Sequence, residues 1–90
     1  MRTLDQTGSF MRDLKRITKR GYDLRKLAKV LSLLQENTPL PMPNRPHPLK
    51  GRWKGFLECH IEPDWLLIYQ VDVVHVTLIR TGTHADLFDE

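Results

Sequence analysis

Along this chain the spacing of the apolar residues changes from a helical period to a strand period, and this change constrains the fold more than any other feature. Apolar residues recur at helical spacing in two segments, residues 10–17 and 24–34. After Gly51 apolar and polar residues alternate, which is typical of a half-buried strand. Helices followed by strands predict the α+β class, with a two-helix hairpin packed on one face of a small antiparallel β-sheet. We expect the other face to be left open for function.

The predicted helices carry their own start and stop signals. Thr7, Gly8 and Ser9 offer N-cap chemistry for the first helix, because a side-chain oxygen there can accept an otherwise unpaired backbone N–H. Gly21 ends that helix, since glycine adopts the left-handed conformation without penalty. Asp23 caps the second helix. So short a turn predicts an antiparallel hairpin, whose apolar stripe over Leu24, Leu27, Leu31 and Leu34 packs on the sheet.

The remaining segments complete one domain over residues 1–90. Residues 1–5 are expected to form a short edge strand, and residues 39–48, with five of the six prolines, an extended connector. Strands are predicted over 53–61, 65–69 and 73–81, with turns at 62–64 and 70–72. A last helical turn is predicted over 85–88.

Composition sets the cellular context. The longest unbroken apolar run covers residues 65–69, whereas a membrane span needs about 20 residues. The N-terminus lacks the apolar region of a secretory signal. Cys59 is the single cysteine, so no internal disulfide can form, and strand alternation places it inward as a small apolar residue. We therefore expect a cytoplasmic protein with no membrane partner.

The charge distribution points to a polyanion. The formal net charge is +3, but residues 10–30 hold eight Lys and Arg against two Asp. Residues 44–60 hold a second basic block. Two basic blocks in a small domain favour nucleic acid as the partner, although a solvated helix face that keeps the protein soluble is an equal alternative on charge alone.

Four histidines are the candidate chemical groups. The chain has no HExxH, no CxxC, no glycine-rich phosphate loop and no nucleophile elbow. His47, His60, His84 and Cys59 match none of the usual metal-ligand spacings, so we expect no metal and no other cofactor. His75 is interpreted as a sheet residue without chemistry. His60 falls on the polar strand face with Glu58 and Lys54, where an ordinary ion pair is the alternative to a functional role.

Together these groups match one reaction. Metal-free cleavage of RNA needs a base for the ribose 2′-OH, an acid for the leaving 5′-oxygen and cations for the phosphate charge. Histidines with lysines and arginines supply all three.

Three segments carry a family resemblance: HPLKGRWKG at residues 47–55, HIEPDWLLIY at 60–69 and RTGTHADLF at 80–88. In this order they resemble the YafQ branch of the RelE/ParE toxin superfamily. The resemblance implies a microbial-RNase-like α+β domain and the toxin of a type II toxin–antitoxin system. Such toxins cut mRNA in the ribosomal A site without a metal ion. The implied partners are the ribosome with its mRNA, a DinJ-like cognate antitoxin, and operator DNA through the antitoxin complex only.

The resemblance also implies roles for single residues. His84 matches the main catalytic histidine, His47 and His60 match two further active-site histidines, and Asp64 matches an active-site acid. Arg80 matches an arginine near the scissile phosphate, and Phe88 an aromatic residue that could stack on a base. Glu58 stands where the family pattern has aspartate, and its role stays open.

The resulting hypothesis is a ribosome-dependent mRNA endonuclease. His84 would be the general acid, either His47 or His60 the base, and Asp64 would orient an imidazole. Further cations for the phosphate would be Lys50, Arg52 and Lys54. Weaker candidates for contact with ribosomal RNA are Arg12, Lys15, Arg16, Lys19 and Lys29. The alternative is a non-catalytic, ParE-like toxin that binds DNA gyrase, although such members lack the histidine set. A further alternative is an inactive member kept for operon regulation.

Overall fold

The computed structural model describes residues 1–88, so residues 89–90 of the predicted domain lie outside the described part. Five strands form one sheet in the order β1-β5-β4-β3-β2. In chain order they are β1 (Thr3–Gln6), β2 (His47–Pro48), β3 (Leu57–Glu62), β4 (Trp65–Val71) and β5 (His75–Gly82). Neighbouring strands are antiparallel except for β1, which is the expected edge strand and pairs with β5 in parallel.

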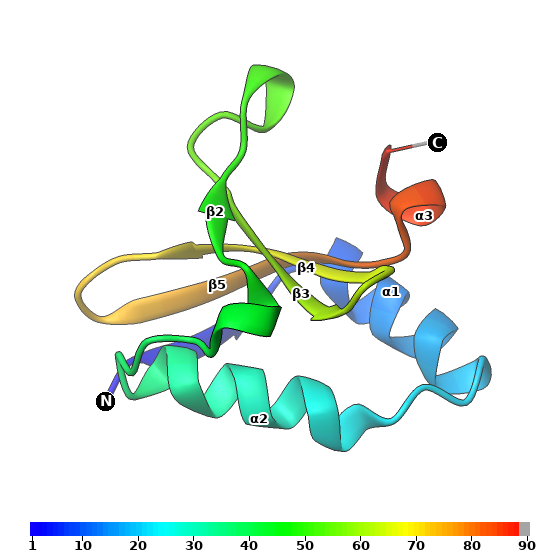
Figure 1. Ribbon diagram of the computed structural model, residues 1–90, viewed down its shortest axis with the longest axis horizontal. Coiled ribbons are helices and arrows are strands. Elements are labelled where there is room, and N and C mark those ends of the chain that lie inside the picture. The colour runs from blue at the N-terminus through cyan, green and yellow to red at the C-terminus, as the bar shows by residue number, and fades with distance from the viewer. Residues whose placement is uncertain (89–90) are drawn as a thin grey trace.

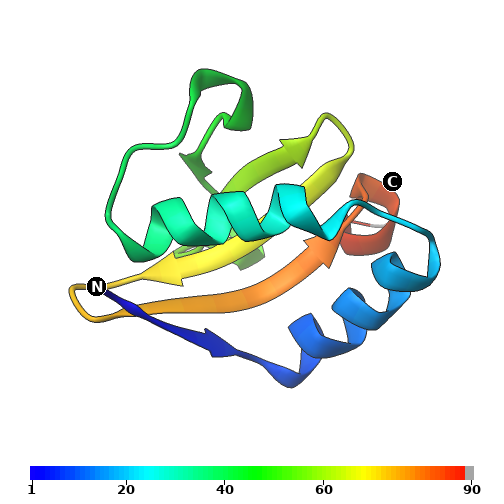
Figure 2. The ribbon, with the colours of Figure 1, turned by 90° about the horizontal axis from the view of Figure 1, so that it is seen from below.

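Two helices cover one face of the sheet and a third lies at its other side. They are α1 (Gly8–Lys19), α2 (Leu24–Gln35) and the short α3 (His84–Phe88). Figure 2 shows α1 and α2 running in opposite directions across the same face and diverging. In Figure 1 the loop between β2 and β3 and helix α3 lie on the opposite side of the sheet. The predicted α+β class is therefore confirmed. Within residues 1–88 no helix is long and apolar enough to cross a membrane.

The helix ends follow the sequence closely. The Thr7 side chain accepts a hydrogen bond from the Phe10 N–H, and Asp23 accepts one from the Arg25 N–H. Gly21 has a φ of 81° just beyond α1, as expected for a glycine that stops a helix. The apolar stripe predicted on α2 differs from the structure at one residue: Leu24, in the first turn, is exposed.

Several strand boundaries differ from the prediction, and turns explain the start of β3 and the end of β4. The strand expected from residue 53 begins at Leu57, because Gly51 and Gly55 have positive φ and form a turn. Lys54 therefore lies in this turn and not on the strand face with the histidines. The turn expected at 70–72 lies after Val71, where the Asp72 carboxylate accepts hydrogen bonds from the backbone N–H groups of Val74 and His75.

The proline-rich segment is less extended than expected. A short 3₁₀ turn occupies Met42–Asn44, and Arg45 then adopts a left-handed conformation with a φ of 46°. The Asn44 amide donates to the carbonyl of His60 at 2.7 Å. These contacts bring His47 into the edge strand β2, where it pairs with Glu58.

Apolar side chains fill both faces of the sheet. The larger core lies beneath α1 and α2 and includes Phe10, Ile17, Trp65 and Leu67. A smaller cluster on the other face is formed by Leu66, Ile68 and Leu87, with partly buried side chains from the β2–β3 loop against it. The second face, expected to be open for function, is therefore partly covered by this loop and α3.

A buried hydroxyl links β4 and β5. Thr81 is fully buried, donates to the Leu66 carbonyl at 2.7 Å and accepts from the Trp65 indole N–H at 2.9 Å. Buried polar groups need such partners, because an unpaired one loses its water without compensation. This bond fixes the core next to the β5–α3 junction.

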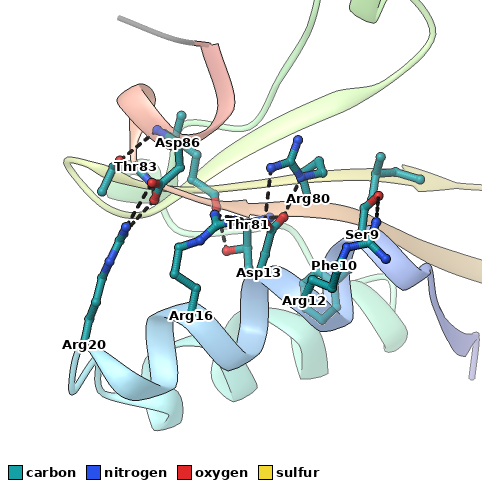
Figure 3. Close-up of polar contacts among 12 residues, drawn as sticks. Ser9, Phe10, Arg12, Asp13, Arg16, Arg20, Arg80, Thr81, Thr83 and Asp86 are labelled. Atoms are coloured by element: carbon teal, nitrogen blue, oxygen red, sulfur yellow. Dashed lines mark hydrogen bonds and ion pairs between the residues drawn. The ribbon is translucent and has the colours of Figure 1, made fainter.

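An ion pair ties α3 to the end of α1 (Figure 3). The Arg20 guanidinium contacts both carboxylate oxygens of Asp86, at 2.6 and 3.1 Å. Asp86 also accepts the Thr83 N–H, and its own N–H donates to the Thr83 hydroxyl. The hydrogen bond with Arg20 holds the pKa of Asp86 well below its usual range. Helix α3, which begins at His84, is thus anchored at its first turn.

Replacement of Thr81 by valine keeps the side-chain shape and removes the hydroxyl. We expect the free energy of unfolding to fall by about 1–3 kcal/mol, because the Trp65 N–H loses its acceptor. Urea denaturation followed by tryptophan fluorescence measures this change. Thr77→Val is the matched control, since the half-exposed Thr77 hydroxyl makes no hydrogen bond within the described chain. Equal losses of unfolding free energy in Thr81→Val and Thr77→Val would contradict a stabilising role for the Trp65–Thr81 hydrogen bond.

The Arg20–Asp86 pair predicts a pH dependence of stability. The pKa of Asp86 is depressed in the folded state, so its contribution is complete above the unfolded value, near 4, and is lost as the pH falls. We expect Asp86→Asn to lower the melting temperature by a few degrees at pH 7. The difference from wild type should shrink as the pH is lowered from 5 to 3. A difference that stays constant over this range would contradict the ionic origin.

Candidate active site

Three histidines from separate elements approach one another on the face of the sheet away from α1 and α2. The ring centroids of His47 and His60 are 6.2 Å apart, and those of His60 and His84 are 6.0 Å apart. His47 comes from β2, His60 from β3 and His84 from the start of α3. Antiparallel pairing explains their common face, because His60 lies opposite Leu66, a member of the smaller apolar cluster. The structure thus brings together the three histidines named from the sequence.

Glu58 lies between two of these histidines. Its Oε1 is 3.3 Å from Nε2 of His47 and 3.8 Å from Nε2 of His60. The Glu58 side chain is only 7% exposed. A nearly buried carboxylate needs a charged partner, and either imidazole supplies one when its Nε2 is protonated. The position that departs from the family pattern therefore carries a carboxylate in contact with the histidines.

Backbone carbonyls orient both imidazoles. Nδ1 of His47 lies 2.8 Å from the Arg45 carbonyl, and Nδ1 of His60 lies 3.2 Å from the Pro63 carbonyl. A carbonyl oxygen only accepts, so each Nδ1 carries a hydrogen and donates it. Each Nε2 is then the nitrogen that can gain or lose a proton, and both face Glu58.

Asp64 holds the third histidine. Its Oδ1 accepts the His84 backbone N–H at 2.9 Å and lies 2.5 Å from His84 Nδ1. The hydrogen bond from the His84 backbone N–H has the larger effect on Asp64 and the contact with the His84 side chain the smaller one. Both hold the pKa of Asp64 below its usual value. Asp64 therefore remains ionised near neutral pH and fixes the proton of His84 on Nδ1. Nε2 of His84 is the nitrogen left for chemistry, in the manner of an aspartate that orients an imidazole.

An aromatic group lies on the same face of the sheet as the histidines, against the smaller apolar cluster. The Trp53 ring centroid lies 6.3 Å from that of Phe88 and 5.7 Å from that of Phe56. The turn that carries Trp53 also carries three exposed cations: Lys50, Arg52 and Lys54. The β2–β3 loop therefore combines positive charge with aromatic surface, which suits a nucleic acid strand.

Arg80 binds an acid of α1. Its Nε lies 2.6 Å from Oδ2 of Asp13, and its Nη2 lies 3.1 Å from Oδ1 (Figure 3). Asp13 projects from α1 and is almost completely buried. Sequence reasoning missed Asp13, because it stands among basic residues on a helix whose apolar spacing does not include it. The only signal was an acid within a basic run.

The candidate cations for ribosomal RNA lie mainly on the exposed side of α1. Arg12, Lys15 and Lys19 are exposed there, and Lys29 is exposed on α2. Arg16 differs, because its guanidinium donates to Oδ1 of Asp13 at 3.1 Å. These helices cover the face of the sheet opposite the histidines, so the basic surface and the histidine site lie on different sides.

Cys59 is remote from this chemistry. It belongs to the core beneath the helices, and burial raises the pKa of its thiol to about 12. A protonated, buried thiol is a poor nucleophile and a poor metal ligand. Among residues 1–88 no three His, Cys, Asp or Glu side chains gather in an arrangement that could hold a metal ion.

Known proteins are similar to this chain in sequence and in fold. A family model described as "Bacterial toxin of type II toxin-antitoxin system, YafQ" matches residues 2–89. The mRNA interferase toxin YafQ of Escherichia coli K12 is 44% identical over 88 residues, which cover 97% of this chain and 96% of that protein.

Two solved structures agree. The crystal structure of YafQ from E. coli BL21(DE3) has a TM-score of 0.92 at 43% identity and covers 98% of this chain and 99% of that one. The YafQ chain of the E. coli DinJ–YafQ toxin–antitoxin complex has a TM-score of 0.89 at 43% identity, with 97% of both chains covered. The match of sequence and fold over nearly the whole length shows that this chain belongs to the YafQ family of bacterial type II toxin–antitoxin toxins.

Proposed function

We propose that this protein is the toxin of a type II toxin–antitoxin pair and that it cleaves mRNA on the ribosome, in the cytoplasm. One observation carries the proposal: an aspartate-oriented histidine lies beside a second histidine whose partner is a buried carboxylate, with ring centroids 6.0 Å apart. Acid–base cleavage of RNA needs two such groups, one on each side of a phosphate. The likeness to an mRNA interferase toxin over nearly the full chain supports the same reaction.

The reaction follows from the proton positions. The His47–Glu58–His60 group takes the proton of the ribose 2′-OH through Nε2 of either histidine. The 2′-oxygen then bonds to phosphorus while the bond from phosphorus to the 5′-oxygen breaks. His84 donates a proton from Nε2 to that 5′-oxygen, and Asp64 stabilises its imidazolium. The products are a 2′,3′-cyclic phosphate and a 5′-OH, and both protons are accounted for without a metal ion.

Cations and aromatic rings complete the substrate contacts. Arg80 stabilises the charge that develops on the phosphate, with support from Lys50, Arg52 and Lys54 in the β2–β3 loop. Phe88, next to Trp53, offers a ring on which a base can stack.

A cognate antitoxin is the proposed inhibitor. The related YafQ toxin is found in a complex with DinJ, and this chain matches it over 97% of its length. We expect a DinJ-like antitoxin to bind the toxin and to make any contact with operator DNA.

His84→Ala tests the catalytic assignment. We expect the cleavage rate to fall by roughly 10²-fold or more, the usual scale for general acid–base catalysis, with the fold retained. Primer extension on an mRNA, with and without translating ribosomes, measures the cuts. His75→Ala is the matched control, because His75 lies at the far end of β5 near Asp72.

Each outcome separates the candidate functions. Cuts that need both ribosomes and His84 support the proposal, and unchanged cleavage by His84→Ala would refute the assignment. If cells arrest with intact mRNA and damaged DNA, the gyrase-binding alternative replaces it.

Charge reversal on α1 tests the ribosome contact. We expect Lys15→Glu with Lys19→Glu to weaken ribosome binding, because each cation that binds a phosphate releases counterions. The salt dependence of log Kd should flatten by about 0.7–0.9 for each phosphate that the variant no longer neutralises, as measured by ribosome pelleting over a range of KCl. Arg25→Glu, which changes an exposed cation on α2, is the control. If the wild type and the double variant bind ribosomes equally well at low salt, Lys15 and Lys19 contribute to solubility only.

A further inference from the structure

The carboxylate of Asp13 has more partners than any other acid described within residues 1–88. Its Oδ2 accepts from Nε of Arg80 at 2.6 Å and from the Thr81 N–H at 3.1 Å. Its Oδ1 accepts from Nη2 of Arg80 and from Nη1 of Arg16, both at 3.1 Å. The Asp13 side chain is only 2% exposed. Two guanidinium groups therefore share one buried carboxylate, and the trio keeps a net charge of about one positive unit.

The Asp13 carboxylate lies at the edge of β5, just beyond the point where the pairing with β1 ends. The pairing of β1 with β5 runs from Thr3 opposite His75 to Gln6 opposite Leu78. Beyond Leu78 the backbone of β5 has no strand neighbour on that side. There Asp13 accepts the Thr81 N–H, so α1 replaces the missing strand with a side-chain acceptor (Figure 3).

A β-bulge turns Arg80 toward the face of the histidines. Leu78 pairs with Tyr69 and Arg80 pairs with Ile68, so Ile79 is an extra residue on β5. Arg80 consequently shares a sheet face with Ile68, which belongs to the apolar cluster on the histidine side. The guanidinium then reaches over the edge of β5 to Asp13.

The geometry leaves one edge of the guanidinium unoccupied. An arginine has five N–H donors in a planar fork, and Asp13 takes one from Nε and one from Nη2. Within the described residues no partner contacts Nη1. The edge formed by Nη1 and the second N–H of Nη2 is therefore still able to bind a phosphate through two hydrogen bonds.

We propose that Asp13 is a positioning residue that orients Arg80, so that only the Nη1–Nη2 edge of the guanidinium faces the scissile phosphate. This inference rests on the proposed ribonuclease activity. Asp13 does not touch the substrate and acts through Arg80. Fixing the guanidinium before the substrate arrives leaves less reorganisation for the transition state, so the effect falls on the cleavage step rather than on ribosome binding.

The kinetic test compares two Asp→Asn variants. We expect Asp13→Asn to lower the single-turnover cleavage rate on ribosomes by roughly ten- to a hundredfold and to leave ribosome affinity unchanged. Asp23→Asn is the control, because it alters an exposed Asp–Arg pair at the start of α2 and keeps the helix cap. A wild-type cleavage rate for Asp13→Asn, or an equal loss in both variants, would overturn the proposal.

A double-mutant cycle separates positioning from general stability. If Asp13 acts through Arg80, then Asp13→Asn combined with Arg80→Ala should cleave no more slowly than Arg80→Ala alone. Losses that multiply would mean that Asp13 acts elsewhere, for example through Thr81, and would overturn the proposal. Circular dichroism melting of each variant shows whether reduced stability explains the loss.

A spectroscopic measurement on the wild-type protein needs no variant and no substrate. ¹⁵N NMR of the arginine side chains should show a protected Nε–H signal for Arg80 and hindered rotation of its guanidinium. The exposed Arg52 should show neither. Free rotation of Arg80 would overturn the proposal. If the wild type instead fails to cleave mRNA while Arg80 is rigid, the proposed function fails and the positioning contact stands.

Discussion

The carboxylate of Asp13 is the contact on which the arrangement of α1 and β5 depends. It joins a helix to the unpaired end of a strand that is 68 residues later in the sequence. A buried carboxylate without partners would be strongly destabilising, so the helix can dock only where Arg80 and Thr81 supply them. The polar requirement of one side chain thus sets the position of α1 along the sheet more sharply than apolar packing does, because apolar contacts are not directional.

The same helix also supports the candidate active site. The far end of α1 carries Arg20, which binds Asp86 in α3. One helix therefore contacts two elements that carry proposed functional groups, Arg80 on β5 and His84 on α3. The histidine side of the sheet is built differently, since Glu58 and two backbone carbonyls orient His47 and His60. Helix docking supports one half of the site and strand pairing supports the other.

Much of the fold was predictable because it rests on local rules. The helix caps at Thr7 and Asp23, the stop at Gly21 and the alternation in β3 depend on neighbours within a few residues. The three histidines were also found, through their motifs. Strand ends were less accurate: Gly51 and Gly55 delay β3, and the Asp72 turn extends β4. The role of Asp13 was missed, because its partners are far away in sequence, and so was the bulge at Ile79, which depends on the register between two strands.

The parallel pairing of β1 with β5 has a consequence for synthesis. Thr3 meets His75, so the first strand has no partner until about 70 further residues have been made. Such long-range contacts form late, because the chain must first close a large loop. The buried partners of α1 also lie on β5, and the histidine of α3 follows that strand directly. A nascent chain therefore cannot bring His47, His60 and His84 together before β5 and the start of α3 have been made.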